Sequence, residues 1–171
     1  MSEPLYLSST REISPNELGE PLASALREYA SRHQLALEGV RMWLTRRENP
    51  PATGFLASLF GRRRNPVDSD PWHDALLVLH STHVLLASHG PSRGTLVQSL
   101  ALALASVARG SVIGVRMGGG LDLPSDDGIT FEGFPGDEGR PGSVFAGLGG
   151  PVADACFEAV REAVTRAKNP R

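Results

Sequence analysis

Residues 75–88 read ALLVLHSTHVLLAS, and this stretch decides the fold. Two apolar runs flank the tetrapeptide His-Ser-Thr-His, which predicts two antiparallel strands joined by a turn at Ser81-Thr82. The predicted cross-strand pairs are Asp74 with His89, Leu76 with Ala87, Val78 with Leu85, and His80 with His83. The opposite side then carries Leu77, Leu79, Val84 and Leu86. Because both sides are apolar, we expect a hairpin at the centre of a sheet that is covered on both faces.

The last third of the chain predicts short strands followed by one closing helix. The strands are expected at residues 111–117, 128–134 and 143–148, and the helix begins at Gly150-Pro151. Along residues 128–134, one face carries Ile129, Phe131 and Gly133, and the other carries Thr130, Glu132 and Phe134. The helix buries one row made of Val152, Cys156, Ala159 and Ala163 and an adjacent row made of Phe157, Val160 and Val164.

Residues 95–108 carry two conflicting signals. Their alanines, and leucines at helical spacing, favour a helix, whereas the hairpin before them and the strand after them favour a strand. We predict a short strand at residues 95–99 followed by an apolar turn, with the helix as the open alternative.

The N-terminal region predicts a helix that starts in two steps. Ser14, Pro15 and Glu17 form the signature of a capped helix start. An apolar stripe follows at spacings of three and four residues, made of Leu18, Leu22, Leu26, Tyr29 and His33. Because Pro21 interrupts a continuous helix, we expect a short turn and then a fresh start at Pro21.

The chain of 171 residues has the composition of a soluble globular protein. We divide it into an N-terminal helical extension, residues 1–39, and a main domain, residues 40–171, with an insert at about 50–71. Its apolar runs are too short for a transmembrane segment, and its first residues lack a signal-peptide pattern, so a cytoplasmic location is expected. The single cysteine, Cys156, excludes an internal disulfide, and its helix row predicts a core residue rather than a nucleophile.

The charged residues are separated along the chain. Five arginines lie in residues 46–64, whereas residues 122–138 hold six acidic residues and no basic one. The net charge is −2, which disfavours a nucleic-acid-binding domain because such domains usually carry a strong positive charge.

Four of the five histidines cluster around the predicted hairpin. A catalytic zinc site needs three protein ligands at one point. The hairpin instead places His80 and His83 at the turn and His73 and His89 at the open end, roughly 20 Å away at about 3.3 Å per residue. No metal is therefore expected, although a two-histidine half-site at the turn stays open.

The insert follows a predicted strand at residues 40–47, which Asn49-Pro50-Pro51 ends. It holds apolar residues four positions apart, typical of two helical turns, and three arginines follow directly. These residues are Phe55, Leu56, Leu59, Phe60, Arg62, Arg63 and Arg64. Two turns of helix are not stable alone. The apolar face therefore either packs on the domain or meets a membrane or partner surface.

Over about residues 40–168 the chain resembles the bacterial branch of the pleckstrin-homology-like (PH-like) domain superfamily. The resemblance lies in residues 74–87 (DALLVLHSTHVLLA) and 142–148 (GSVFAGL), which lead into the closing helix at 151–168. It implies an α+β fold: a bent antiparallel β-barrel of seven strands closed by a C-terminal helix, here with an extra N-terminal helix. It also implies binding to phospholipid headgroups, peptides or other proteins rather than catalysis. In lipid-binding members the loop after the first strand is the basic one, and the insert holds that position here.

A non-catalytic cytoplasmic binding or interaction module is therefore expected, without a cofactor. Its partner would be a protein or an anionic membrane surface that contacts the seven insert residues from Phe55 to Arg64. Two alternatives from other classes stay open. One is a small metal-dependent or serine hydrolase that uses His80 and His83, and the other is a nucleic-acid-binding protein that uses the arginine-rich insert.

Overall fold

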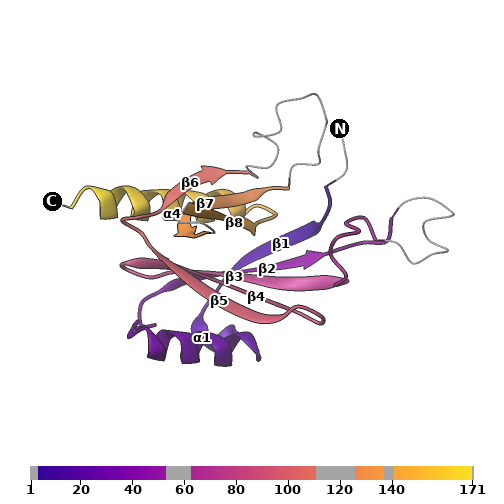
Figure 1. The fold of residues 1–171 in the computed structure, drawn as a ribbon, viewed down its shortest axis with the longest axis horizontal. Helices are drawn as coiled ribbons and strands as arrows, with labels where there is room; N and C mark the ends of the chain where they lie inside the picture. The colour runs from indigo at the N-terminus through magenta and orange to yellow at the C-terminus, as the bar shows by residue number, and fades with distance from the viewer. Residues whose placement is uncertain (1–3, 53–62, 111–125, 137–140, 171) are drawn as a thin grey trace.

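The computed structural model describes residues 4–52, 63–110, 126–136 and 141–170. These parts of the chain form two antiparallel sheets and two α-helices, an α+β fold (Figure 1). The first sheet has the order β1-β2-β3-β4-β5 and the second the order β6-β7-β8. The elements are β1 (Leu7–Ile13), the 3-10 turn η1 (Pro15–Glu17), α1 (Leu22–Arg32), β2 (Arg41–Glu48), β3 (Trp72–Leu79), β4 (His83–Gly90), β5 (Gly94–Ala101), β6 (Ser106–Arg109), β7 (Gly128–Pro135), β8 (Pro141–Gly147) and α4 (Ala153–Lys168).

β3 and β4 form the predicted hairpin in the predicted register. Val78 lies opposite Leu85, and the backbone N–H of His80 donates to the carbonyl of His83 across the turn at 2.9 Å. β3 is the middle strand of the first sheet. The prediction of a central hairpin is therefore confirmed.

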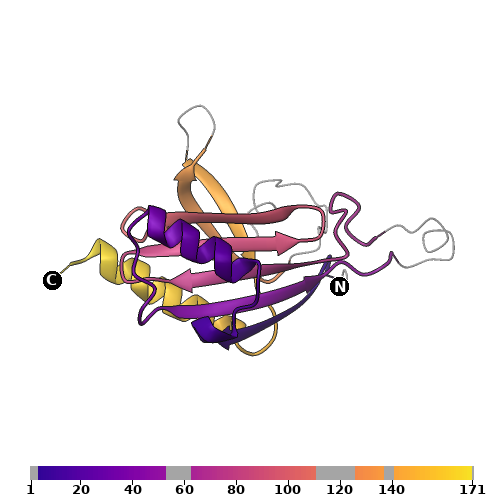
Figure 2. The same cartoon turned by 90° about the horizontal axis from the view of Figure 1, so that it is seen from below.

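α1 covers one face of the first sheet (Figure 2). Leu22 and Leu26 of this helix are buried in one apolar cluster with Met42, Val78 and Leu85 of the strands. Burial of such side chains contributes about 1.5–3 kcal/mol each. A helix of 11 residues is not stable on its own in water, so the packing of this cluster stabilises α1.

The second sheet and α4 cover the opposite face (Figure 1). Trp43 and Leu77 of the first sheet share a core with Phe131 of the second sheet and with Cys156 and Val160 of α4. All five side chains are at most 2% exposed. The predicted buried face of the closing helix is confirmed, and both faces of the hairpin are covered as expected.

The N-terminal helix begins in two steps, as predicted. The backbone N–H of Ser14 donates to Oε2 of Glu17 at 2.8 Å around η1. α1 then starts afresh after Pro21.

β1 is a strand that the sequence did not predict, because its polar residues LSSTREI lack an apolar alternation. Thr10 explains why it forms. Its Oγ1 lies 2.8 Å from Oγ1 of Thr45 on β2, and it accepts the backbone N–H of Gly149 at 2.9 Å. The N–H of Thr10 donates in turn to the carbonyl of Gly149 at 3.0 Å. β1 is thus joined both to β2 and to the loop before α4.

Residues 95–105 form a strand and a turn, as predicted, and residues 106–108 begin β6, so the helical alternative is excluded. After β5 the chain turns with a backbone hydrogen bond from Leu104 to Ala101 at 3.0 Å. It then enters β6, a second strand that the sequence did not predict. The strand expected at residues 111–117 lies outside the described residues.

The predicted alternation along β7 is wrong at Phe134. The register shifts between Glu132 and Phe134, and Gly133 adopts a φ of 117°, a backbone conformation that favours glycine. This bulge turns Phe134 into the core with Ile129 and Phe131 instead of away from them.

The described strands lie in two separate sheets, so the closed barrel implied by the resemblance stays a prediction. Neither helix in the described parts of the chain is long and apolar enough to cross a bilayer.

We predict that Phe131→Ala lowers the free energy of unfolding by about 3–5 kcal/mol, because it removes a large side chain from a closely packed core. Urea denaturation followed by circular dichroism measures this change. The matched control is Leu104→Ala, since Leu104 is 70% exposed, and it should change the stability by less than about 0.5 kcal/mol. Equal effects of the two substitutions would contradict the proposed core.

Candidate functional site

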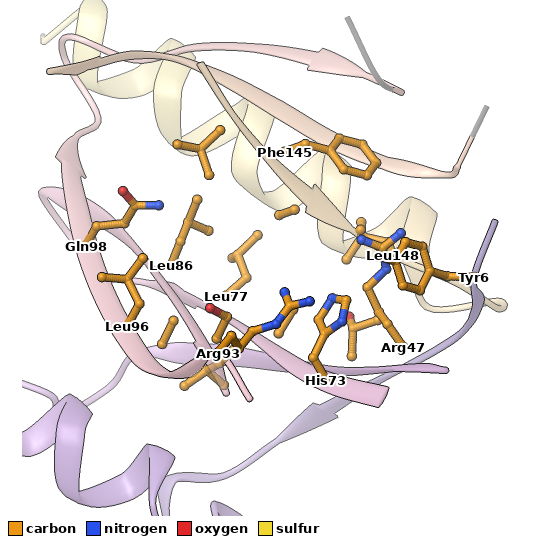
Figure 3. Close-up of a pocket in the computed structure, with 18 residues that line it drawn as sticks. Tyr6, Arg47, His73, Leu77, Leu86, Arg93, Leu96, Gln98, Phe145 and Leu148 are labelled. Carbon is orange, nitrogen blue, oxygen red and sulfur yellow. The ribbon is translucent and has the colours of Figure 1, made fainter. Parts of the chain in front are cut away.

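A cavity of about 210 Å³ lies between the two sheets (Figure 3). The inner face of β2–β5 forms one wall, and β8 with the residue after it forms the other. We call it the inter-sheet cavity. Its lining is Tyr6, Thr45, Arg47, His73, Ala75, Leu76, Leu77, Leu86, Ala87, Ser88, Arg93, Leu96, Gln98, Val144, Phe145, Ala146, Gly147 and Leu148.

The strand pairing places polar residues at one end of the cavity and apolar residues toward the core. Arg47 of β2 lies opposite His73 of β3, the next pair inward is Thr45 with Ala75, and the pair after it is the fully apolar Trp43 with Leu77. Each strand thus changes from apolar to polar side chains toward the same end of the sheet. The cavity is therefore polar at the end where Arg47 and His73 lie.

Arg47 is a buried charge at this end of the cavity, at 7% exposure. Its guanidinium forms an ion pair with Asp126 and stacks over the ring of Tyr6, with Cζ 4.1 Å from the ring centre. Burial lowers the pKa of Arg47, while Asp126 and Tyr6 act in the opposite direction. An arginine nevertheless stays protonated in proteins, so a positive charge is held between the sheets.

Because Gly147 on β8 has no side chain, the guanidinium of Arg47 can occupy the space beside it. A Cβ built at position 147 would lie 2.5 Å from Cζ of Arg47. A side chain at this position therefore requires Arg47 to move.

Arg93 reaches the same end of the cavity from the turn between β4 and β5. It pairs with Asp68 and with Asp70, the Nε of Arg93 lying 3.0 Å from Oδ2 of Asp70. Asp70 also accepts the backbone N–H of Ser92 at 2.7 Å. These bonds fix the turn against the segment that precedes β3.

His73 is the third basic side chain at this end, and it is only 5% exposed. Its ring meets the edge of Tyr6 with centres 5.3 Å apart, and its Nδ1 lies 3.5 Å from Oδ2 of Asp68. That nitrogen makes no hydrogen bond within the described residues. Burial, followed by the charges of Arg93 and Arg47, lowers the pKa of His73 from 6.5 to about 4. The imidazole is therefore neutral at pH 7.

The insert residues predicted to dock on a surface are described only in part. Phe55, Leu56, Leu59, Phe60 and Arg62 lie outside the described residues. The other two, Arg63 and Arg64, sit at the base of the insert.

Both of these arginines contact backbone carbonyls at that base. Arg63 Nη1 donates to the carbonyl of Asn49 at 2.9 Å, and Arg64 Nη1 donates to that of Pro4 at 3.0 Å. Pro51 pairs with Arg63 in an isolated β-bridge, so the insert leaves and re-enters the domain at one point.

The histidines of the hairpin are separated as predicted. At the turn, ring nitrogens of His80 and His83 lie 3.0 and 2.8 Å from Oγ1 of Thr82. At the other end of the hairpin, His89 lies opposite Asp74 in the strand register. Within the described ranges, no three His, Cys, Asp or Glu side chains gather to hold a metal ion.

Cys156 lies in the core as predicted, fully buried. Burial raises the pKa of its thiol to about 12, which leaves the thiol protonated and unreactive at neutral pH.

No family model, curated protein or solved structure matches this chain. The inter-sheet cavity therefore has to be interpreted from its own geometry. The sequence did not reveal this cavity, because Arg47 falls within the run of five arginines at residues 46–64 and His73 at the open end of the predicted hairpin. The available signal was the shared change from apolar to polar residues toward one end of β2 and β3.

We predict that the free energy of unfolding falls as the pH drops from about 6.5 to about 4, because the unfolded chain then takes up a proton that His73 in the folded state does not. The part due to His73 is about 2–3 kcal/mol between pH 7 and pH 4.5. His73→Gln should remove it, as measured by urea denaturation at the two pH values. His89→Gln, at a half-buried position on the next strand, should keep the wild-type pH dependence. An unchanged pH dependence in His73→Gln would contradict this assignment.

Proposed function

We propose that this chain is a non-catalytic binding module of the PH-like type, which takes a small ligand into the inter-sheet cavity. The observation that carries the proposal is the cavity itself, which combines an apolar body with a few buried polar groups at one end. Binding sites for small molecules usually have this composition.

The order of the described elements supports the PH-like part of the proposal. Seven strands, β2–β8, precede the closing helix α4, in the order that the resemblance implies. β1 and α1 are then additions on the first sheet, and α1 covers the face turned away from the cavity.

The surroundings of the histidines favour binding over hydrolysis. A serine hydrolase needs a hydroxyl within hydrogen-bonding reach of its histidine base. In the described parts of the chain, His73 has no such partner, and the hydroxyl at the hairpin turn, that of Thr82, is shared between the two half-buried imidazoles of His80 and His83.

To test ligand binding, the full chain is purified from its native host and extracted, and bound small molecules are identified by mass spectrometry. We expect a molecule in near-stoichiometric amount that is lost from Val144→Trp, because an indole at position 144 fills the cavity that Val144 lines. Leu104→Trp is the matched control, since Leu104 is exposed and does not line the cavity. Equal recovery from both variants would exclude the cavity as the binding site.

The insert supports a second contact, with an anionic membrane surface or a protein partner, as the sequence predicts. The favourable observation is that the paired residues Pro51 and Arg63 hold the two ends of the insert together at the edge of the domain. An arginine at an anionic surface contributes about 1 kcal/mol, and Arg63 and Arg64 already donate to backbone carbonyls, so stable attachment would require the apolar residues.

We expect that the wild type sediments with vesicles containing anionic lipid and that Phe60→Asp reduces the sedimented fraction several-fold. Val67→Asp provides the control, because Val67 is 93% exposed but lies outside the predicted docking residues. Equal sedimentation of all three proteins, or none of any, would remove the membrane version of this proposal.

A further inference from the structure

We infer that the inter-sheet cavity binds a small monocarboxylate with an apolar body of about six to eight carbons, its carboxylate held by Arg93, His73 and Arg47. This inference rests on the proposed ligand-binding function and names the chemical class of the ligand. Three features of the cavity lead to it.

The first feature is an excess of hydrogen-bond donors at the polar end. The basic side chains Arg47, His73 and Arg93 line the cavity, whereas the carboxylates that pair with the arginines do not. Figure 3 shows the side chains of Arg93 and His73 pointing into the cavity, with Arg47 beside Tyr6.

Both arginines keep donors for a ligand. Arg93 uses Nε and Nη2 on Asp70 and Asp68, and Arg47 uses Nε and Nη2 on Ser8 and Asp126. Neither Nη1 donates to a described residue. A carboxylate accepts several such N–H groups at once, and arginine is suited to its planar shape.

The second feature is the buried, unpartnered nitrogen of His73. Buried polar groups in proteins nearly always have a hydrogen-bond partner, so a bound ligand that supplies one is favoured. The charges of Arg93 and Arg47 lower the pKa of His73, whereas those of Asp68 and Asp70 raise it.

The third feature is the size and apolar character of the rest of the cavity. Leu86 and Leu96 line the part away from the basic side chains, and Leu77 lies between the two ends (Figure 3). An apolar cavity of about 150 Å³ holds one benzene molecule, so 210 Å³ accommodates a somewhat larger ligand. Gln98 is the polar side chain labelled at that end, and it is neutral, so a second charge on the ligand would find no opposite charge there, which favours a single carboxylate.

The test compares octanoate, 3-phenylpropanoate and the neutral octanol by isothermal titration calorimetry with the full chain at pH 7. We expect at least one acid to bind ten-fold or more tightly than octanol, because a charged hydrogen bond in a buried site has about this effect. Octanoate alone would indicate an aliphatic acid, and 3-phenylpropanoate alone an aromatic one. Either result supports the inference.

Arg93→Gln should weaken binding of the acid at least ten-fold and that of octanol less than two-fold. Arg46→Gln is the matched control, because Arg46 pairs with Asp74 outside the cavity, and it should change neither affinity. If Arg93→Gln does not fold, as judged by circular dichroism, Gly147→Ala replaces it. A Cβ at position 147 displaces Arg47, so this variant should show the same selective loss of the acid.

Equal binding of the acids and octanol would overturn the monocarboxylate inference while leaving ligand binding in the cavity in place. Absence of binding by all three probes would also overturn it. In that case the extraction experiment with Val144→Trp decides separately whether the cavity binds a ligand of another class.

Discussion

The pairing of β3 with β4 is the interaction on which the rest of the structure depends. Both faces of this hairpin are apolar, so neither can be left in contact with water. One face is covered by α1, and the other by the second sheet together with α4. The three-layer arrangement follows from this single constraint, because a hairpin with one polar face would need only one covering layer.

β3 and its other neighbour, β2, produce the polar end of the inter-sheet cavity. Their inner residues are apolar near Trp43 and Leu77 but become basic at Arg47 and His73. The two sheets therefore pack closely at one end and enclose buried charges at the other. Ion pairs with acidic residues from distant parts of the chain compensate these charges, since an unpaired buried charge would be strongly destabilising.

Much of the fold could be predicted from the sequence, because it follows from local apolar patterns. The hairpin register, the two-step start of α1 and the buried face of α4 all have this origin. β1 could not be predicted, since it depends on contacts of Thr10 far along the chain. The inward turn of Phe134 depends on a bulge that alternation does not reveal. The candidate site was missed for a similar reason: Arg47 is buried by its pairing with Asp126, 79 residues later.

The bonds between Thr10 and Gly149 join positions 139 residues apart. β1 is synthesised long before Gly149, so Thr10 has no Gly149 to bind until synthesis has passed that residue. β1 can pair with β2 earlier, but its contact with the loop before α4 is a late event in folding, and long-range closure of this kind is intrinsically slow. A chain that stops before residue 149 leaves one edge of the sheet open to pairing with other molecules.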